Sequence, residues 1–108
     1  QLGCNVFINS GCTFLDNAAI SIGSNSLIGP NVTLTTVSHP VHPKSRHGEV
    51  ITSSIKIGSN VWLGAGVVVL PGVIIGNNSV IAANSVVTSN VPDNTLFAGA
   101  PAVFKRSI

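Results

Sequence analysis

Residues 57–92 decide the fold and read IGSNVW LGAGVV VLPGVI IGNNSV IAANSV VTSNVP. In each hexad the first residue is aliphatic, the fourth is Asn or Gly, and the fifth is Val or Ser. An α-helix is excluded, because the apolar period is not 3.6 and Asn or Gly at every sixth residue would be costly. Asn and Gly tolerate a left-handed backbone, so a corner is expected every six residues, with short Val- and Ile-rich strands between corners.

The same repeat occupies most of the N-terminal half. Further hexads begin at Leu2, Ile8 and Phe14 and, after two extra residues, at Ile22, Ile28 and Leu34. The fourth place is Asn or Gly in eleven of the twelve hexads. Three sides per turn give an 18-residue coil, so the sequence predicts an all-β fold. Four triangular coils, at 2–19, 22–39, 57–74 and 75–92, would stack as parallel strands around a thin core.

The repeat breaks once in its interior. The only fourth place without Asn or Gly is Val37, in the hexad that ends with His39. A long interval without repeats follows, and such loops inside compact folds are usually functional. We therefore predict a β-helix domain over 1–92, an excursion loop at 40–56, and a tail at 93–108 that caps the coil.

Composition excludes several classes of protein. Hydrophobic residues make up 44% of the chain, but no apolar run approaches the ~18 residues that a membrane span requires. The net charge of +2 does not favour nucleic-acid binding. Cys4 and Cys12 have neither disulfide-framework nor zinc-ligand spacing, so we interpret them as free thiols in a reducing, cytoplasmic setting. The chain starts at Gln1 and has no Met, which suggests a fragment or processed product. A thin core with an open end favours an oligomer.

The hexads resemble those of the left-handed parallel β-helix acyltransferases, the hexapeptide-repeat family. Within it, the chain looks most like the maltose and galactoside O-acetyltransferases. The matching segments are 28–34 (IGPNVTL), 39–42 (HPVH), 48–49 (GE), 57–64 (IGSNVWLG), 71–76 (PGVIIG) and 98–102 (AGAPA). The left-handed sense of the coil is implied by this resemblance alone.

The resemblance implies a mechanism. Such enzymes are homotrimers with active sites between subunits, and they move acetyl from acetyl-CoA to a hydroxyl of a sugar or related acceptor. His39 matches the general base, since imidazole exchanges protons near neutral pH. Asn9 matches a donor to the acceptor hydroxyl or the oxyanion. Glu49 is a candidate to orient His39, and no metal is expected.

The resemblance also implies binding residues. The acceptor-binding candidates are Asp16, Asn17 and Trp62. The candidates for contacts to CoA are Ala65, Ala83, Thr88, Lys105 and Arg106. Ser89 and Val103 stand where relatives often carry Lys and Arg, so two charges directed at CoA phosphates are absent from those places.

Two other classes of function stay open at this stage. Zinc carbonic anhydrases share this coil and use three His ligands, for which His39, His42 and His47 are the available residues. A non-catalytic structural or ligand-binding coil, such as an ice-binding solenoid, would need Thr arrays that recur in successive coils. Here Thr33, Thr35 and Thr36 do not recur in this way.

Overall fold

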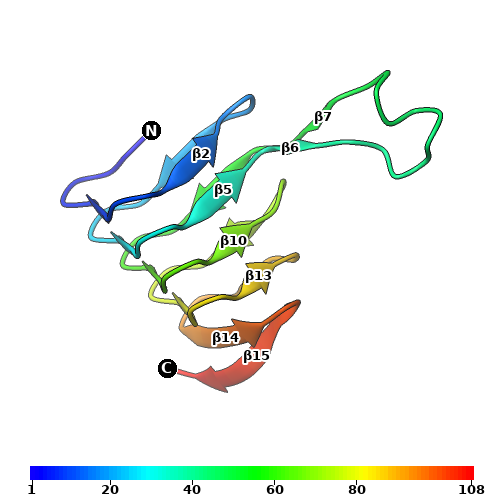
Figure 1. Ribbon diagram of the computed structural model, residues 1–108. Helices are drawn as coiled ribbons and strands as arrows, with labels where there is room; N and C mark the ends of the chain where they lie inside the picture. The colour runs from blue at the N-terminus through cyan, green and yellow to red at the C-terminus, as the bar shows by residue number, and fades with distance from the viewer.

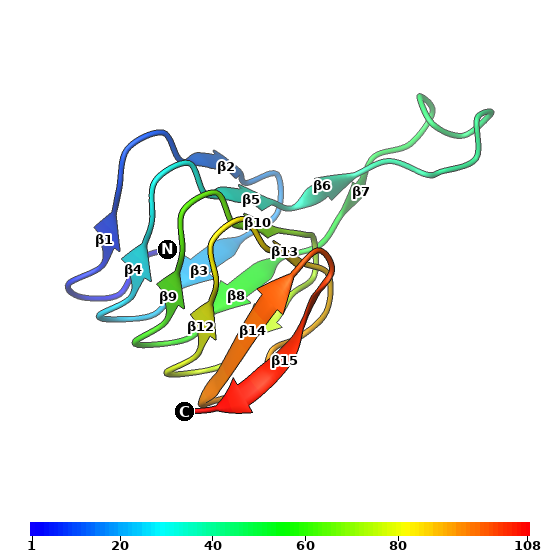
Figure 2. The same cartoon turned by 60° about the horizontal axis from the view of Figure 1, so that its bottom comes forward.

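The computed structural model describes residues 1–108, and all its regular elements are β-strands stacked in a coil (Figures 1 and 2). The first sheet contains, in order, β1 (Phe7–Ile8), β4 (Leu27–Ile28), β9 (Trp62–Leu63), β12 (Val80–Ile81), β14 (Thr95–Gly99) and β15 (Ala102–Ser107). The second contains β2 (Thr13–Leu15), β5 (Thr33–Thr35), β10 (Val68–Val69) and β13 (Val86–Val87). The third contains β3 (Ile20–Ile22), β8 (Ile55–Ile57) and β11 (Ile74–Ile75), while β6 (Val37–Ser38) and β7 (Ile51–Thr52) form a separate hairpin.

Most of the predicted corners have the left-handed backbone that the repeat requires. Nine of the eleven Asn and Gly residues in the fourth place have φ between 57° and 82°. They are Asn5, Gly11, Asn25, Asn31, Asn60, Gly66, Gly72, Asn78 and Asn84. The expectation was wrong for Asn17 and Asn90, and both of these lie at the same corner of the triangle.

This corner, between the second and third sheets, is where the length of the coil changes, and we term it the variable corner. Ile22 lies eight positions after Phe14, whereas Val91, in the equivalent pair of the last coil, lies only four positions after Val87. In the second coil, the hairpin of β6 and β7 leaves from the same corner (Figure 2). The other two corners keep the six-residue spacing throughout. Asn17 and Asn90 therefore lie in connections that are longer and shorter than a hexad, which explains their different backbone.

The core is a narrow column of aliphatic side chains from the first and fifth places. Leu34, Leu63 and Ile81 are fully buried, whereas Leu2 in the first coil is 56% exposed. Serines in fifth places also point inward, and the Ser26 hydroxyl donates to the Gly58 carbonyl of the next coil at 3.0 Å. No buried side-chain N or O atom lacks a hydrogen-bond partner. The core is thus well closed except at its N-terminal end.

The tail continues the first sheet. β14 pairs in parallel with β12, and β15 folds back antiparallel to β14. The rings of Phe97 and Phe104 meet edge to face, with centroids 6.1 Å apart. The structure contains no helix with the length and apolarity to cross a membrane.

Candidate active site

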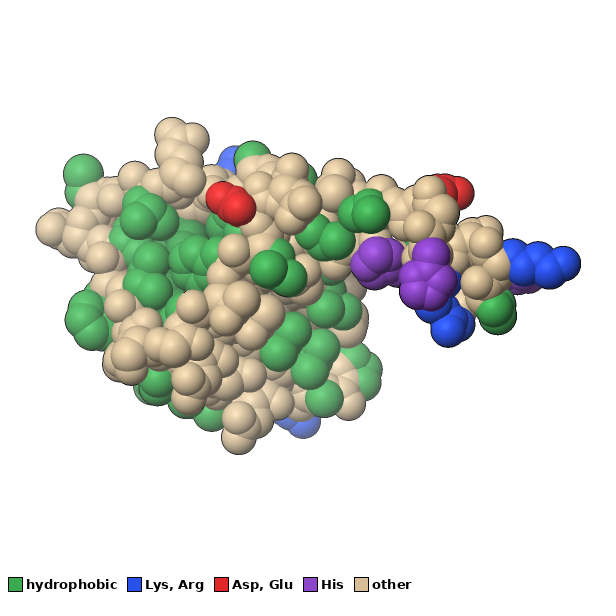
Figure 3. All heavy atoms as spheres, turned by 45° about the horizontal axis from the view of Figure 1, so that its top comes forward, with side chains coloured by type: hydrophobic (Ala, Val, Ile, Leu, Met, Phe, Trp, Pro, Cys, Tyr) green, Lys and Arg blue, Asp and Glu red, His purple; other side chains and the backbone are tan.

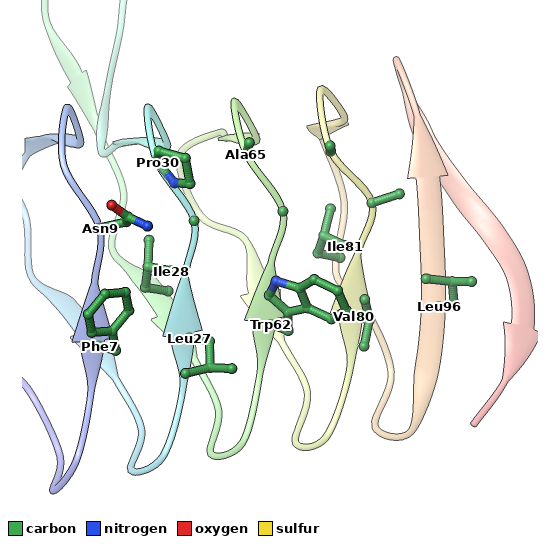
Figure 4. Close-up of a pocket in the computed structure, with 14 residues that line it drawn as sticks. Phe7, Asn9, Leu27, Ile28, Pro30, Trp62, Ala65, Val80, Ile81 and Leu96 are labelled. Atoms are coloured by element: carbon green, nitrogen blue, oxygen red, sulfur yellow. The ribbon is translucent and has the colours of Figure 1, made fainter.

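A groove of about 730 Å³ runs along the outer face of the first sheet (Figure 4). Its wall is a row of outward side chains, one from each successive coil, because parallel in-register strands place equivalent residues side by side. They are Phe7, Leu27, Trp62, Val80 and Leu96. Phe7, Leu27 and Trp62 are each at least 50% exposed. The groove therefore offers a long apolar surface.

The groove exists because the residues next to the strands have small side chains. They are Gly29, Pro30, Gly64, Ala65, Ala82 and Ala83. The N–H groups of Gly66 and Asn84 bond to the carbonyls of Pro30 and Ala65 in the preceding coil, at 2.9 and 2.8 Å. The N–H groups of Ala65 and Ala83, in contrast, have no partner in the chain. Two unpaired donors, one coil apart, therefore line the groove.

Asn9 is the only side chain of this groove with a hydrogen-bonding amide. Its Oδ1 accepts the N–H of Ser10 at 2.7 Å. A backbone N–H can only donate, so the oxygen must face it and the amide nitrogen must point the other way. Figure 4 shows that nitrogen turned toward Ile28. The amide nitrogen of Asn9, with its two N–H donors, is thus the group left free for further hydrogen bonds.

His39 lies on the projecting loop, at the end of β6, away from this groove. Figure 3 shows the histidines of this loop, with basic residues, standing out from the coil. The ring is exposed, and its Nδ1 lies 3.1 Å from the carbonyl oxygen of Arg46. His39 is one of five residues that line a separate cleft of about 480 Å³. No hollow of the chain contains both His39 and Asn9.

The other predicted residues fall in several places. Trp62, Ala65 and Ala83 line the groove together with Asn9. Asp16 and Asn17 line a second hollow at the open end of the coil. Thr88 is exposed after β13, and Lys105 and Arg106 are exposed on β15. Within one chain the structure does not bring all these residues together.

Glu49 is exposed in the loop, and it is the Arg46 carbonyl, not Glu49, that accepts a hydrogen bond from Nδ1 of His39. The three histidines that could have bound zinc are His39, His42 and His47. Of these, His42 uses its Nδ1 to accept a hydrogen bond from the N–H of Lys44 at 3.2 Å. No group of three or more His, Cys, Asp or Glu side chains is placed to hold a metal ion.

Sequence reasoning missed four of the five residues in the wall of the groove. They are Phe7, Leu27, Val80 and Leu96. The signal for the first three lay in the sixth place of the first hexad in each coil, which reads Phe7, Leu27, Trp62 and Val80. We predicted Trp62 as an acceptor-binding residue, and the structure shows that it is one member of this row. The Arg46 carbonyl had no signal, because a backbone oxygen carries no residue identity.

Comparisons with known proteins match both the repeat and the fold. Residues 54–89 match the family model described as bacterial transferase hexapeptide, six repeats. The chain is 47% identical to galactoside O-acetyltransferase of Escherichia coli, over 100% of this chain and 54% of that protein. The chain thus spans about half the length of the curated relatives it matches.

Two solved structures superpose closely. A hexapeptide-repeat acetyltransferase of Vibrio cholerae, complexed with acetyl coenzyme A, has a TM-score of 0.96 and 45% identity, over 98% of this chain and 58% of that one. A maltose O-acetyltransferase of Clostridium difficile has a TM-score of 0.96 and 43% identity, over 100% of this chain and 58% of that one. The predicted all-β fold class and the resemblance to the hexapeptide-repeat transferases are both confirmed, and the chain has the left-handed parallel β-helix fold of these proteins.

Proposed function

We propose that the protein is an O-acetyltransferase that moves acetyl from acetyl-CoA to a hydroxyl of a sugar or related acceptor. The observation that carries this proposal is the groove, whose mostly apolar lining includes the oriented amide of Asn9 and two residues with unpaired backbone N–H groups, Ala65 and Ala83. Pantetheine has the matching chemistry, because its two amide carbonyls accept hydrogen bonds and its chain is largely apolar. The relatives named for galactoside, maltose and acetyl coenzyme A support the same assignment.

The chemistry needs one base and one oxyanion donor. His39 takes the proton of the acceptor hydroxyl on Nε2, and the hydroxyl oxygen attacks the thioester carbonyl carbon. The Asn9 amide donates to the tetrahedral oxyanion. As the C–S bond breaks, the thiolate of CoA takes the proton back from the imidazolium. Glu49, Asp16 and Asn17 remain proposals for orienting the base and the acceptor.

The separation of His39 and Asn9 supports an active site between subunits. We propose a homotrimer in which the loop of one subunit brings His39 to the groove of its neighbour. The exposed row of Phe7, Leu27 and Trp62 would then face this neighbour as well as the substrates. The two unpaired thiols, Cys4 and Cys12, support a cytoplasmic location.

A mixing experiment tests this shared site. Asn9→Ala alone should lower kcat by about 10²–10³-fold, because one oxyanion donor is lost. His39→Ala alone should lower kcat by about 10²–10⁴-fold, because the general base is lost. In co-expressed trimers, about a quarter of the interfaces would pair an intact His39 with an intact Asn9, and activity should return to about that fraction. Co-purified mixed trimers that stay inactive would show that both residues act within one subunit.

We also propose that Arg106 contacts a phosphate of CoA. It pairs with Leu96 across β14 and β15, and directly opposite residues point to the same face of a sheet. Leu96 lines the groove, so Arg106 lies at its C-terminal end. The register shifts next to this pair, leaving Lys105 as an extra residue. Without this bulge, Arg106 would turn to the other face.

Arg106→Gln should therefore raise KM for acetyl-CoA about 10-fold with little change in kcat, because a charged hydrogen bond to phosphate is lost. Acetyl-pantetheine lacks the nucleotide phosphates, so its KM should not change. Lys56→Gln, which removes an equal charge from β8 on another sheet, is the control and should behave like the unmodified protein. An equal effect of Arg106→Gln on both thioesters would contradict the proposed contact.

A further inference from the structure

The loop that carries His39 is held by few hydrogen bonds. Three of them are local: Ser45 N–H to the His42 carbonyl, Gly48 N–H to the Ser45 carbonyl, and Lys44 N–H to His42 Nδ1. They join residues two or three positions apart and therefore shape single turns. Within residues 39–50, the two bonds with a longer span both involve Arg46, which accepts one through its carbonyl and donates the other through its guanidinium.

The first of these bonds determines the tautomer of the neutral His39 ring. The Arg46 carbonyl lies 3.1 Å from Nδ1 of His39, and a carbonyl can only accept. In the neutral ring the proton must then be on Nδ1, which leaves the lone pair on Nε2. A neutral histidine side chain free in water prefers the opposite tautomer, so this contact determines which nitrogen can act as a base.

The second bond places that carbonyl. Nη2 of Arg46 donates to the carbonyl of Val41 at 3.0 Å. Val41 lies two residues after His39, so the guanidinium closes the loop onto the strand end that carries the imidazole. The same residue thus contacts His39 through its backbone and the neighbouring segment through its side chain. Lys44, two residues away, makes no side-chain hydrogen bond.

We propose that Arg46 is a positioning residue: its guanidinium holds the loop so that its carbonyl keeps the proton of His39 on Nδ1 and leaves Nε2 as the base. This inference rests on the proposed role of His39 in acetyl transfer. Arg46 itself touches neither the groove nor a reacting atom. Its effect therefore appears in the tautomer and in kcat and not in binding of acetyl-CoA.

The test compares Arg46→Met with Lys44→Met in the full chain. Both changes remove one positive charge from the same exposed loop and keep an unbranched side chain. Long-range ¹H–¹⁵N spectra of ¹⁵N-histidine-labelled protein report which ring nitrogen carries the proton. We expect His39 to be protonated on Nδ1 in the unmodified protein and in Lys44→Met, and to shift toward the Nε2–H form in Arg46→Met.

Kinetics complete the test. Arg46→Met should lower kcat about 10- to 100-fold, the effect of a misplaced catalytic group, with KM for acetyl-CoA unchanged. Arg46→Lys should restore part of both the tautomer and kcat, since its ammonium can still reach toward Val41. An unchanged tautomer in Arg46→Met, or an equal loss in Lys44→Met, would overturn the inference. A shifted tautomer with unchanged kcat would leave the contact standing and refute His39 as the base.

Discussion

Replacing His39 with Ala should lower kcat for acetyl transfer by about 10²–10⁴-fold, the contribution expected of a general base. The side chain is exposed and packs against no part of the core, so the coil should keep its thermal stability. The measurement is release of free CoA thiol from acetyl-CoA, with a panel of sugars and other hydroxyl compounds as acceptors. The same panel identifies the acceptor.

The matched control is His47→Ala, which removes the same side chain from the same loop and should keep most of the activity. Equal losses in both variants, together with one bound zinc per chain, would instead favour the three-histidine alternative. Turnover by His39→Ala at the normal rate would refute its role as the base. Circular dichroism on each variant separates lost chemistry from lost structure.

Replacing Gly23 with Val should abolish folding. A Cβ at Gly23 would lie 2.5 Å from the carbonyl carbon and 2.6 Å from the carbonyl oxygen of Gly58 in the next coil. Those atoms are backbone, and the Gly58 N–H is itself bonded to Ile75, so they cannot move aside without opening the stack. Overpacking typically costs ~1–3 kcal/mol, and a clash with backbone should exceed this. A domain of this size has only about 5–15 kcal/mol to lose.

Gly48→Val provides the contrast, because a Cβ there would meet only the Ser45 carbonyl oxygen, at 3.9 Å. Its melting temperature should stay within a few degrees of that of the unmodified protein. Gly23→Ala is the intermediate step and should lower the melting temperature by roughly 4–8 °C for each kcal/mol lost. A cooperative melt of Gly23→Val close to that of Gly48→Val would show that the coils are less tightly stacked than the structure indicates.

The scaffold was predictable because each part of the hexad has a separate physical task. Val61 is buried because the fifth place points inward, and Asn60 turns the chain because its backbone tolerates positive φ. These demands are local, so they appear directly in the sequence. Asn17 and Asn90 were predicted wrongly because the same residue type occupies connections of other lengths, and only the register between coils reveals this.

The site was less predictable for a different reason. His39 and Asn9 could be selected from the break in the repeat and from the family resemblance. Their hydrogen-bond partners could not be predicted, because these are the backbone carbonyl of Arg46 and the backbone N–H of Ser10. The two unpaired N–H groups of Ala65 and Ala83 are likewise properties of the backbone and not of alanine. Any residue small enough for the groove would present them equally well.

The variable corner has a consequence for how such a protein can change. At two corners the six-residue spacing keeps the strands of neighbouring coils in register. An insertion at either corner would shift the strands that follow out of this register. At the third corner the chain already gains or loses residues, and the strands on both sides still meet their partners. The segment that carries His39 leaves from there. This loop could therefore be replaced by one of another length or sequence without changing the pairing of the coil. Such a replacement would give the protein a new acceptor preference.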